Sequence, residues 1–163
     1  MHILLIFSSF ILSSFIALSA QAVNPSGLPI PRFVSLKAAE TNLRTGPGTR
    51  YPIQWVLKRE DMPVEVVDEF DLWRKVRADD GTNGWVHHTM LSGKRHVMVI
   101  GKEPQTFYID SKRDSKPLFK AEPHVIAPVR ECELDWCRVQ ISGKKAWIEK
   151  KNLWGVYPED IFD

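Results

Sequence analysis

The stretch TNLRTGPGTRYPI, residues 41–53, decides how the fold is interpreted, because two glycines flank a proline between an arginine and a Tyr-Pro pair. A phosphate-binding loop would need consecutive free backbone N–H groups, usually at the start of a helix. Pro47 removes an N–H group from the middle of the turn, and Pro52 prevents a helix from beginning directly after it. The stretch is therefore interpreted as a tight turn that uses the conformational freedom of glycine.

Short runs rich in valine, isoleucine, tryptophan and phenylalanine surround this turn, and turn-forming residues separate them. Because helical periodicity is almost absent, the pattern predicts an all-β barrel or sandwich. The segment between residues 77 and 84 is dense in turn formers, so the two runs that flank it should form a hairpin. We expect strands over residues 33–38, 53–57, 64–68, 73–77 and 84–87.

The same pattern recurs later in the chain. LWRKVR, at residues 72–77, matches DWCRVQ, at residues 135–140. Two further blocks, which begin at Gly84 and Met90, recur at Ala146 and Asn152 with nearly the same offset. Agreement of the offset within one position across three blocks predicts two tandem β modules of about sixty residues each.

The overall composition limits the class of partner. The chain has 163 residues, of which 44% are hydrophobic and 26% charged, and a formal net charge of +2. These values are ordinary for a soluble globular protein. Acidic and basic residues are interspersed, whereas a nucleic-acid binder usually has a clustered basic face. We therefore expect no nucleic-acid partner.

The first 22 residues form an apolar run without Asp, Glu, Lys or Arg. The run ends in Ala20-Gln21-Ala22, which places small residues where signal peptidase cleaves. A retained membrane anchor is the alternative, because the run approaches the length of a bilayer span. We favour a cleaved signal peptide, because five serines interrupt the run and a turn-prone segment follows it. The mature chain would then begin at Val23, be periplasmic or secreted, and have no stable membrane insertion.

Cys132 and Cys137 both lie in the part of the chain that would be exported. In an oxidising compartment this spacing favours a disulfide over free thiols or a metal site. Zinc would need two further ligands, and the histidines are scattered. By comparison with the first module, the two cysteines should face each other across a short hairpin, with Cα atoms about 5.5 Å apart.

Motifs for catalysis are absent from the sequence. Neither G-x-S-x-G nor H-E-x-x-H occurs. A cysteine nucleophile would need a low pKa and a histidine partner, whereas Cys137 follows another cysteine five positions earlier. We expect a protein that is not an enzyme, with no cofactor and no metal.

Several motifs of the first module resemble, in order and spacing, those of bacterial SH3 domains. NLRTGP, from Asn42, is similar to their N-x-R-x-G-P motif. WRKVR, from Trp73, is similar to their central strand, and DGTNGWV, from Asp80, to their closing hairpin. The second module keeps Trp136 and Trp147 but lacks the arginine and the Gly-Pro pair in its first loop.

The resemblance implies two tandem small SH3-like β-barrels after an N-terminal signal peptide, and a non-catalytic, exported protein. LWGVYP, from Leu153, is similar to the close of exported bacterial proteins built from paired SH3-like domains. The expected organisation is a signal peptide (1–22), a proline-rich segment (23–33), a first domain (34–92), a divergent second domain (97–155) and a C-terminal tail (156–163).

Six residues of the first module are candidates for ligand binding. In the family pattern the arginine more often pins its loop through backbone carbonyls than binds a ligand. The core is the favoured place for each tryptophan, but the tyrosine and three tryptophans exceed one thin core. Some of them should line a groove beside the first loop, where SH3-like domains bind extended peptides. The candidates are Asn42, Arg44, Tyr51, Trp55, Trp73 and Trp85.

Two functions fit these expectations. The first is an exported binding module that recognises cell-wall peptide or glycan, with peptidoglycan as its partner. The alternative is a structural or protein–protein interaction component of the periplasm, with a periplasmic protein as its partner.

Overall fold

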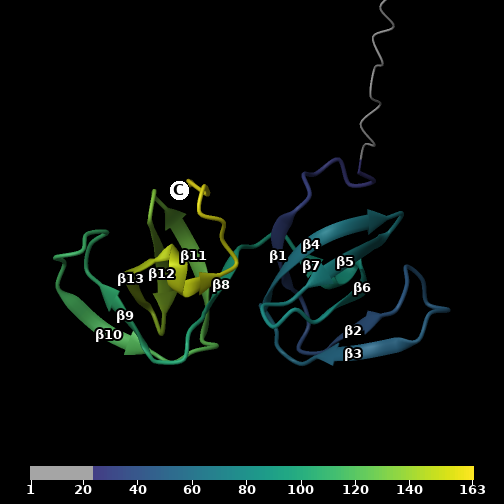
Figure 1. Cartoon of the computed structure of the whole chain (residues 1–163), viewed down its shortest axis with the longest axis horizontal. Coiled ribbons are helices and arrows are strands. Elements are labelled where there is room, and N and C mark those ends of the chain that lie inside the picture. The colour runs from purple at the N-terminus through teal and green to yellow at the C-terminus, as the bar shows by residue number, and fades with distance from the viewer. Residues whose placement is uncertain (1–23) are drawn as a thin grey trace, which may run out of the picture.

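The structure, a computed structural model, describes residues 24–163, and the predicted signal peptide at residues 1–22 lies outside them. Figure 1 shows two β modules joined by a short connection, each built on a seven-stranded antiparallel sheet. Within the described residues, no helix has the length and apolar character needed to cross a membrane. The helical elements in this range are the single turns η1 (His88–Met90) and η2 (Lys150–Asn152).

The two modules have the same topology. The strand order is β3-β2-β6-β5-β4-β1-β7 in the first sheet and β10-β9-β13-β12-β11-β8-β14 in the second. The first sheet comprises β1 (Arg32–Leu36), β2 (Thr41–Arg44), β3 (Ile53–Leu57), β4 (Pro63–Phe70), β5 (Trp73–Arg77), β6 (Asn83–His87) and β7 (Leu91–Ser92). The second comprises β8 (His96–Val99), β9 (Gln105–Tyr108), β10 (Pro117–Ala121), β11 (Ile126–Cys132), β12 (Trp136–Ile141), β13 (Lys144–Glu149) and β14 (Leu153–Trp154). The predicted all-β fold with an internal repeat is confirmed.

The predicted hairpin of the first module is present. Strands β5 and β6 pair from Trp73 opposite His87 to Arg77 opposite Asn83. The turn between them is closed by Asp80, whose carboxylate accepts a hydrogen bond of 2.8 Å from the backbone of Thr82. This bond, made to the ionised carboxylate, lowers the pKa of Asp80 below its ordinary value.

The core of the first module is aliphatic. The expectation that the core is the favoured place for the tryptophans is wrong here, because Trp55 is 50% exposed and Trp73 and Trp85 are only half-buried. Side chains alternate along a strand, and Val76 and Val86 occupy the inward positions of β5 and β6. The buried side chains are Leu36, Leu43, Val64, Val66, Val76 and Val86.

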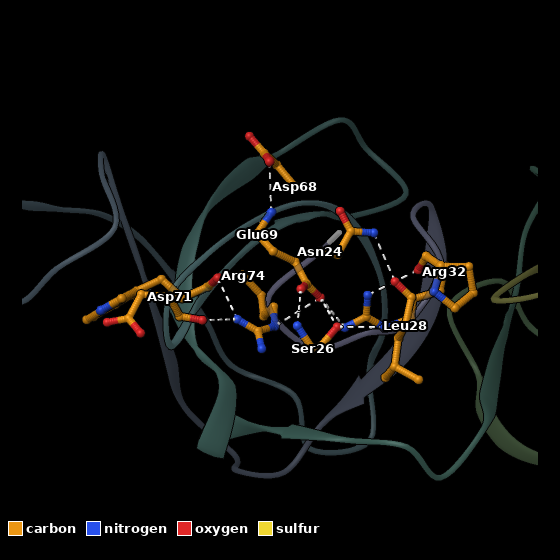
Figure 2. Close-up of polar contacts among 10 residues, drawn as sticks. Asn24, Ser26, Leu28, Arg32, Asp68, Glu69, Asp71 and Arg74 are labelled. Atoms are coloured by element: carbon orange, nitrogen blue, oxygen red, sulfur yellow. Dashed lines mark hydrogen bonds and ion pairs between the residues drawn. The ribbon is translucent and has the colours of Figure 1, made fainter. Parts of the chain in front are cut away.

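Glu69, at the end of β4, attaches the N-terminal segment to the first module (Figure 2). Its buried carboxylate accepts hydrogen bonds from the backbone N (2.9 Å) and Oγ (2.7 Å) of Ser26. The same carboxylate lies 2.6 Å from Nη2 of Arg32 and 3.1 Å from Nε of Arg74. Burial alone would raise the pKa of Glu69, but the hydrogen bonds from Ser26 and Arg32 outweigh burial and hold the pKa below its ordinary value of 4.5.

The predicted disulfide joins Cys132 and Cys137, which face each other across the β11–β12 hairpin. Their Cα atoms are 4.1 Å apart, closer than the separation expected from the sequence. The backbone of Cys132 exchanges both its hydrogen bonds with Phe162 of the C-terminal tail. The cysteines therefore form a non-hydrogen-bonded pair, the type in which cross-strand Cα atoms lie closest.

The two modules contact each other through residues near the end of the chain. The indole Nε1 of Trp154 donates a hydrogen bond of 3.0 Å to the carbonyl of Pro63. The rings of Trp154 and Tyr157 pack against Phe33, with centroids 5.0 and 4.7 Å away. The hydroxyl of Tyr157 donates a hydrogen bond of 2.9 Å to the buried carboxylate of Glu65. Burial first, and then this bond and the charge of Glu65, raise the pKa of Tyr157 above its ordinary value.

Gly155 lies between the modules, at the centre of this contact. Its φ of +114° belongs to the region that favours glycine. A Cβ atom there would lie 2.5 Å from the carbonyl oxygen of His96 and 3.1 Å from Cβ of Pro63. The close approach of Gly155 to strand β8 of its own module, and to Pro63 of the first module, therefore depends on a residue without a side chain.

Candidate functional site

The first loop of the first module is held by Arg44. One of its guanidinium nitrogens, Nη1, donates hydrogen bonds to the carbonyls of Thr49 (3.1 Å) and Tyr51 (2.7 Å). The ring of Tyr51 folds over Gly46, where a Cβ atom would lie only 2.5 Å from the ring. Arg44 therefore positions this loop through backbone carbonyls, the role that the family pattern implied.

Trp73 and Trp85 lie on the outer face of the first module. Trp85 is the cross-strand neighbour of both Arg44 and Lys75. Trp73 contacts the ring of His87 edge-on, with centroids 5.5 Å apart. Cross-strand neighbours project from the same face of a sheet, so these side chains form one aromatic and basic surface.

Asn42 and Trp55 do not join this surface as closely. The Asn42 side chain is exposed, and it makes no hydrogen bond within residues 24–163. Trp55 lies in the edge strand β3, where Ile53 (47% exposed) and Val56 (43%) are also exposed. Arg44 and Tyr51 thus belong to the first loop, Trp73 and Trp85 to the outer face, Asn42 to β2 and Trp55 to the edge strand β3. Neither of the pockets found within residues 24–163 is lined by any of the six.

A pocket of about 410 Å³ occurs in the second module instead. Trp136, which is 8% exposed, forms one wall and contacts the ring of Tyr108 edge-on at a centroid distance of 5.6 Å. The turn between β11 and β12 supplies Leu134 and Asp135, and the β9–β10 loop supplies Arg113. Apolar side chains from residues 153–158 complete the lining.

Three further charged residues line this pocket, and each already has a partner. The amine of Lys150 donates hydrogen bonds to the carbonyls of Leu134 (2.7 Å), Pro158 (3.0 Å) and Asp160 (2.6 Å). The amine of Lys151 forms an ion pair with the carboxylate of Glu149. Lys150 therefore fixes the wall of the pocket and is not available to a ligand.

None of the six residues predicted for ligand binding lines this pocket. Trp136 is not among the six predicted binding residues, although the internal repeat places it at the position of Trp73. That repeat was the signal that could have identified it. Arg113 carried no such signal, because the first loop of the second module diverges from that of the first.

Within residues 24–163, no group of three or more His, Cys, Asp or Glu side chains is arranged to hold a metal ion. His87 and His88 are adjacent, with ring centroids 4.8 Å apart. His87 is engaged with Thr89, whose hydroxyl lies 2.8 Å from its Nδ1.

The family model of the bacterial SH3 domain matches the chain twice, at residues 37–93 and 101–155. The chain belongs to the bacterial SH3 domain family. The resemblance found in the sequence motifs is confirmed, and so is the pair of SH3-like domains. Bacterial SH3 domains are binding modules, so the prediction that the chain is a binding module, with no ligand specified, is confirmed as well.

Among solved structures, this bacterial SH3 protein is similar to an NlpC/P60 family protein from Bacillus cereus ATCC 10987, with 15% identity and a TM-score of 0.34. The match covers 75% of this chain and 55% of that chain. NlpC2 and NlpC1 from Trichomonas vaginalis match with 11% and 12% identity and TM-scores of 0.33. These matches cover 76% and 86% of this chain, and 48% and 50% of the others. The chain spans about half the length of these structures, and no curated protein matches it.

Proposed function

We propose that this protein is an exported, non-catalytic binding protein that recognises cell-wall peptide or glycan in peptidoglycan. The observation that carries the proposal is the pocket beside Trp136, whose volume of about 410 Å³ lies within the usual range for small-ligand sites. An aromatic wall flanked by charges of both signs suits an extended peptide or the face of a sugar ring.

Two observations support export. Cys132 and Cys137 form a buried disulfide, and such bonds persist in oxidising compartments. The predicted signal peptide at residues 1–22 also indicates export. The protein would act in the periplasm or after secretion.

Co-sedimentation of the purified chain with insoluble peptidoglycan tests the proposal. The wild type should be retained, and Leu134→Ser should reduce retention because it removes an apolar side chain from the pocket. Leu134 is 74% exposed, so the substitution should not disturb folding.

Leu118→Ser provides the matched control. Leu118 is also exposed, at 47%, but it lies in β10 and does not line the pocket. Retention of this variant should equal that of the wild type. A wild-type chain that stays in the supernatant would contradict the proposed function, and equal losses in both variants would contradict the pocket as its site.

The second candidate function, a protein–protein interaction component of the periplasm, is favoured by strand β3. This edge strand exposes Ile53, Trp55 and Val56 together. Exposed apolar patches of this kind mark interaction sites in many soluble proteins. If this function is correct, crosslinking of the wild type should yield one defined protein adduct that Trp55→Ser abolishes, without retention of the chain on bare peptidoglycan.

A further inference from the structure

Two charged side chains in the pocket of the second module have no partner among residues 24–163. The guanidinium of Arg113 and the carboxylate of Asp135 both line the pocket, and neither forms an ion pair or a side-chain hydrogen bond within residues 24–163. The other charged side chains in the lining already have partners within the protein. Glu149 forms an ion pair with Lys151, and the amine of Lys150 donates hydrogen bonds to three carbonyls.

The two free charges come from different elements. Arg113 belongs to the β9–β10 loop, and Asp135 belongs to the β11–β12 turn. Trp136 and apolar side chains of residues 153–158 form the lining shared by both. The pocket thus combines an apolar surface with one unpaired basic side chain and one unpaired acidic side chain from the described residues.

The turn that carries Asp135 is firmly held. The disulfide between Cys132 and Cys137 closes the turn, and the backbone N–H of Lys150 donates a hydrogen bond of 2.8 Å to the carbonyl of Asp135. The amine of Lys150 binds the carbonyl of the preceding Leu134. A charge on a rigid turn loses little conformational freedom when a ligand binds, which favours affinity.

We infer that this pocket selects a short peptide segment that presents one free carboxylate and one free ammonium group, in which Arg113 binds the carboxylate and Asp135 binds the ammonium group. Each is a charge-assisted contact of the type that recognises ionised groups strongly. Because the pocket is the binding site of the proposed function, this inference rests on that function and narrows its ligand to a zwitterionic peptide.

The test uses trialanine as the probe, together with its N-acetylated and its C-amidated forms. Binding to the purified chain is measured by titration, with the NMR signal of the Trp136 indole as the reporter of the pocket. Free trialanine should bind, and blocking either end should weaken binding about tenfold, the effect of losing one charge-assisted contact.

Two substitutions assign each end of the peptide. Arg113→Gln should remove the difference between trialanine and its amide, and Asp135→Asn should remove the difference between trialanine and its acetylated form. Lys112→Gln and Glu133→Gln, neighbours that do not line the pocket, should leave all three affinities unchanged. All four residues are exposed, so folding should be preserved in each variant.

Equal binding of the free and blocked peptides would overturn the inference, and so would the absence of binding by all three. Either result, together with peptidoglycan retention that depends on Leu134, would leave the proposed function in place. A chain that distinguishes the three peptides as expected, yet fails to bind peptidoglycan, would support the zwitterion site and contradict the proposed function.

Discussion

Glu69 and Arg74 face each other across the β4–β5 hairpin, at the position that Cys132 and Cys137 occupy in the β11–β12 hairpin. The internal repeat aligns each member of this ion pair with one of the two cysteines. Both pairs also hold a terminal segment, because Ser26 binds Glu69 and Phe162 binds Cys132. One module thus uses an ion pair where the other uses a covalent bond.

Glu69→Gln should destabilise the first module strongly. The Glu69 side chain is fully buried, and the substitution leaves Arg32 and Arg74 with backbone carbonyls but without the carboxylate that neutralises their charges. Breaking a buried ion pair in this way costs about 3 kcal/mol. Chemical denaturation would measure the loss, and Glu60→Gln, at an exposed position, should have little effect. A loss as small as that of Glu60→Gln would contradict the structural role of the cluster.

The stabilisation from Glu69 should depend on pH. Its pKa in the folded chain is below the ordinary value of 4.5, so folding favours the ionised carboxylate. The contribution is therefore complete above pH 4.5 and disappears as the pH falls through the lower, folded pKa. The difference in unfolding free energy between wild type and Glu69→Gln should shrink as the pH is lowered from neutrality into the acid range. A constant difference would show that ionisation of Glu69 is irrelevant.

The disulfide should contribute modest stability to the second module. It closes a turn of few residues, so the loss of chain entropy in the unfolded state is small, and we expect about 2 kcal/mol. The Cys132→Ala, Cys137→Ala double variant should lose this amount in denaturant titrations. Thiol titration of the denatured wild type should find no free thiol, and two thiols per chain would contradict the bond.

Gly155→Ala should disturb the packing of the chain against β8 and, through Pro63, the contact between the modules. The new Cβ atom would approach the backbone of His96 and Cβ of Pro63, and the residue would also keep a positive φ. We expect a cost of about 3 kcal/mol in denaturant titrations, from overpacking added to backbone strain.

Gly143→Ala is the control for backbone strain alone. Gly143 also has a positive φ, but a Cβ atom there meets nothing within 4 Å. The free energy of unfolding of this variant should fall by about 1 kcal/mol. Equal losses of unfolding free energy in the two variants would show that the close approach at Gly155 does not affect stability.

Much of the fold followed from local sequence patterns. Strands β3 and β5 have the predicted bounds, because alternating side chains and turn formers act over a few residues. The disulfide was also predictable, since the repeat placed both cysteines on one hairpin.

The candidate site was less predictable because it depends on distant residues. The pocket combines Arg113 of a divergent loop, the turn before Trp136 and side chains of residues 149–158, which local sequence patterns do not bring together. The predicted burial of the tryptophans of the first module is wrong for a related reason. The small core is already filled by valines such as Val76 and Val86, which leaves the aromatic rings outside.

The contacts around Gly155 also fix the spacing between the two modules. Because Trp154 and Tyr157 pack against Phe33, one module can turn relative to the other only if these ring contacts break. A flexible tandem would accept two epitopes at many separations, whereas a rigid pair gains from simultaneous engagement only when the spacing matches. A polymer bound by both modules at once would therefore be bound most tightly when its repeat matches the spacing that these contacts set.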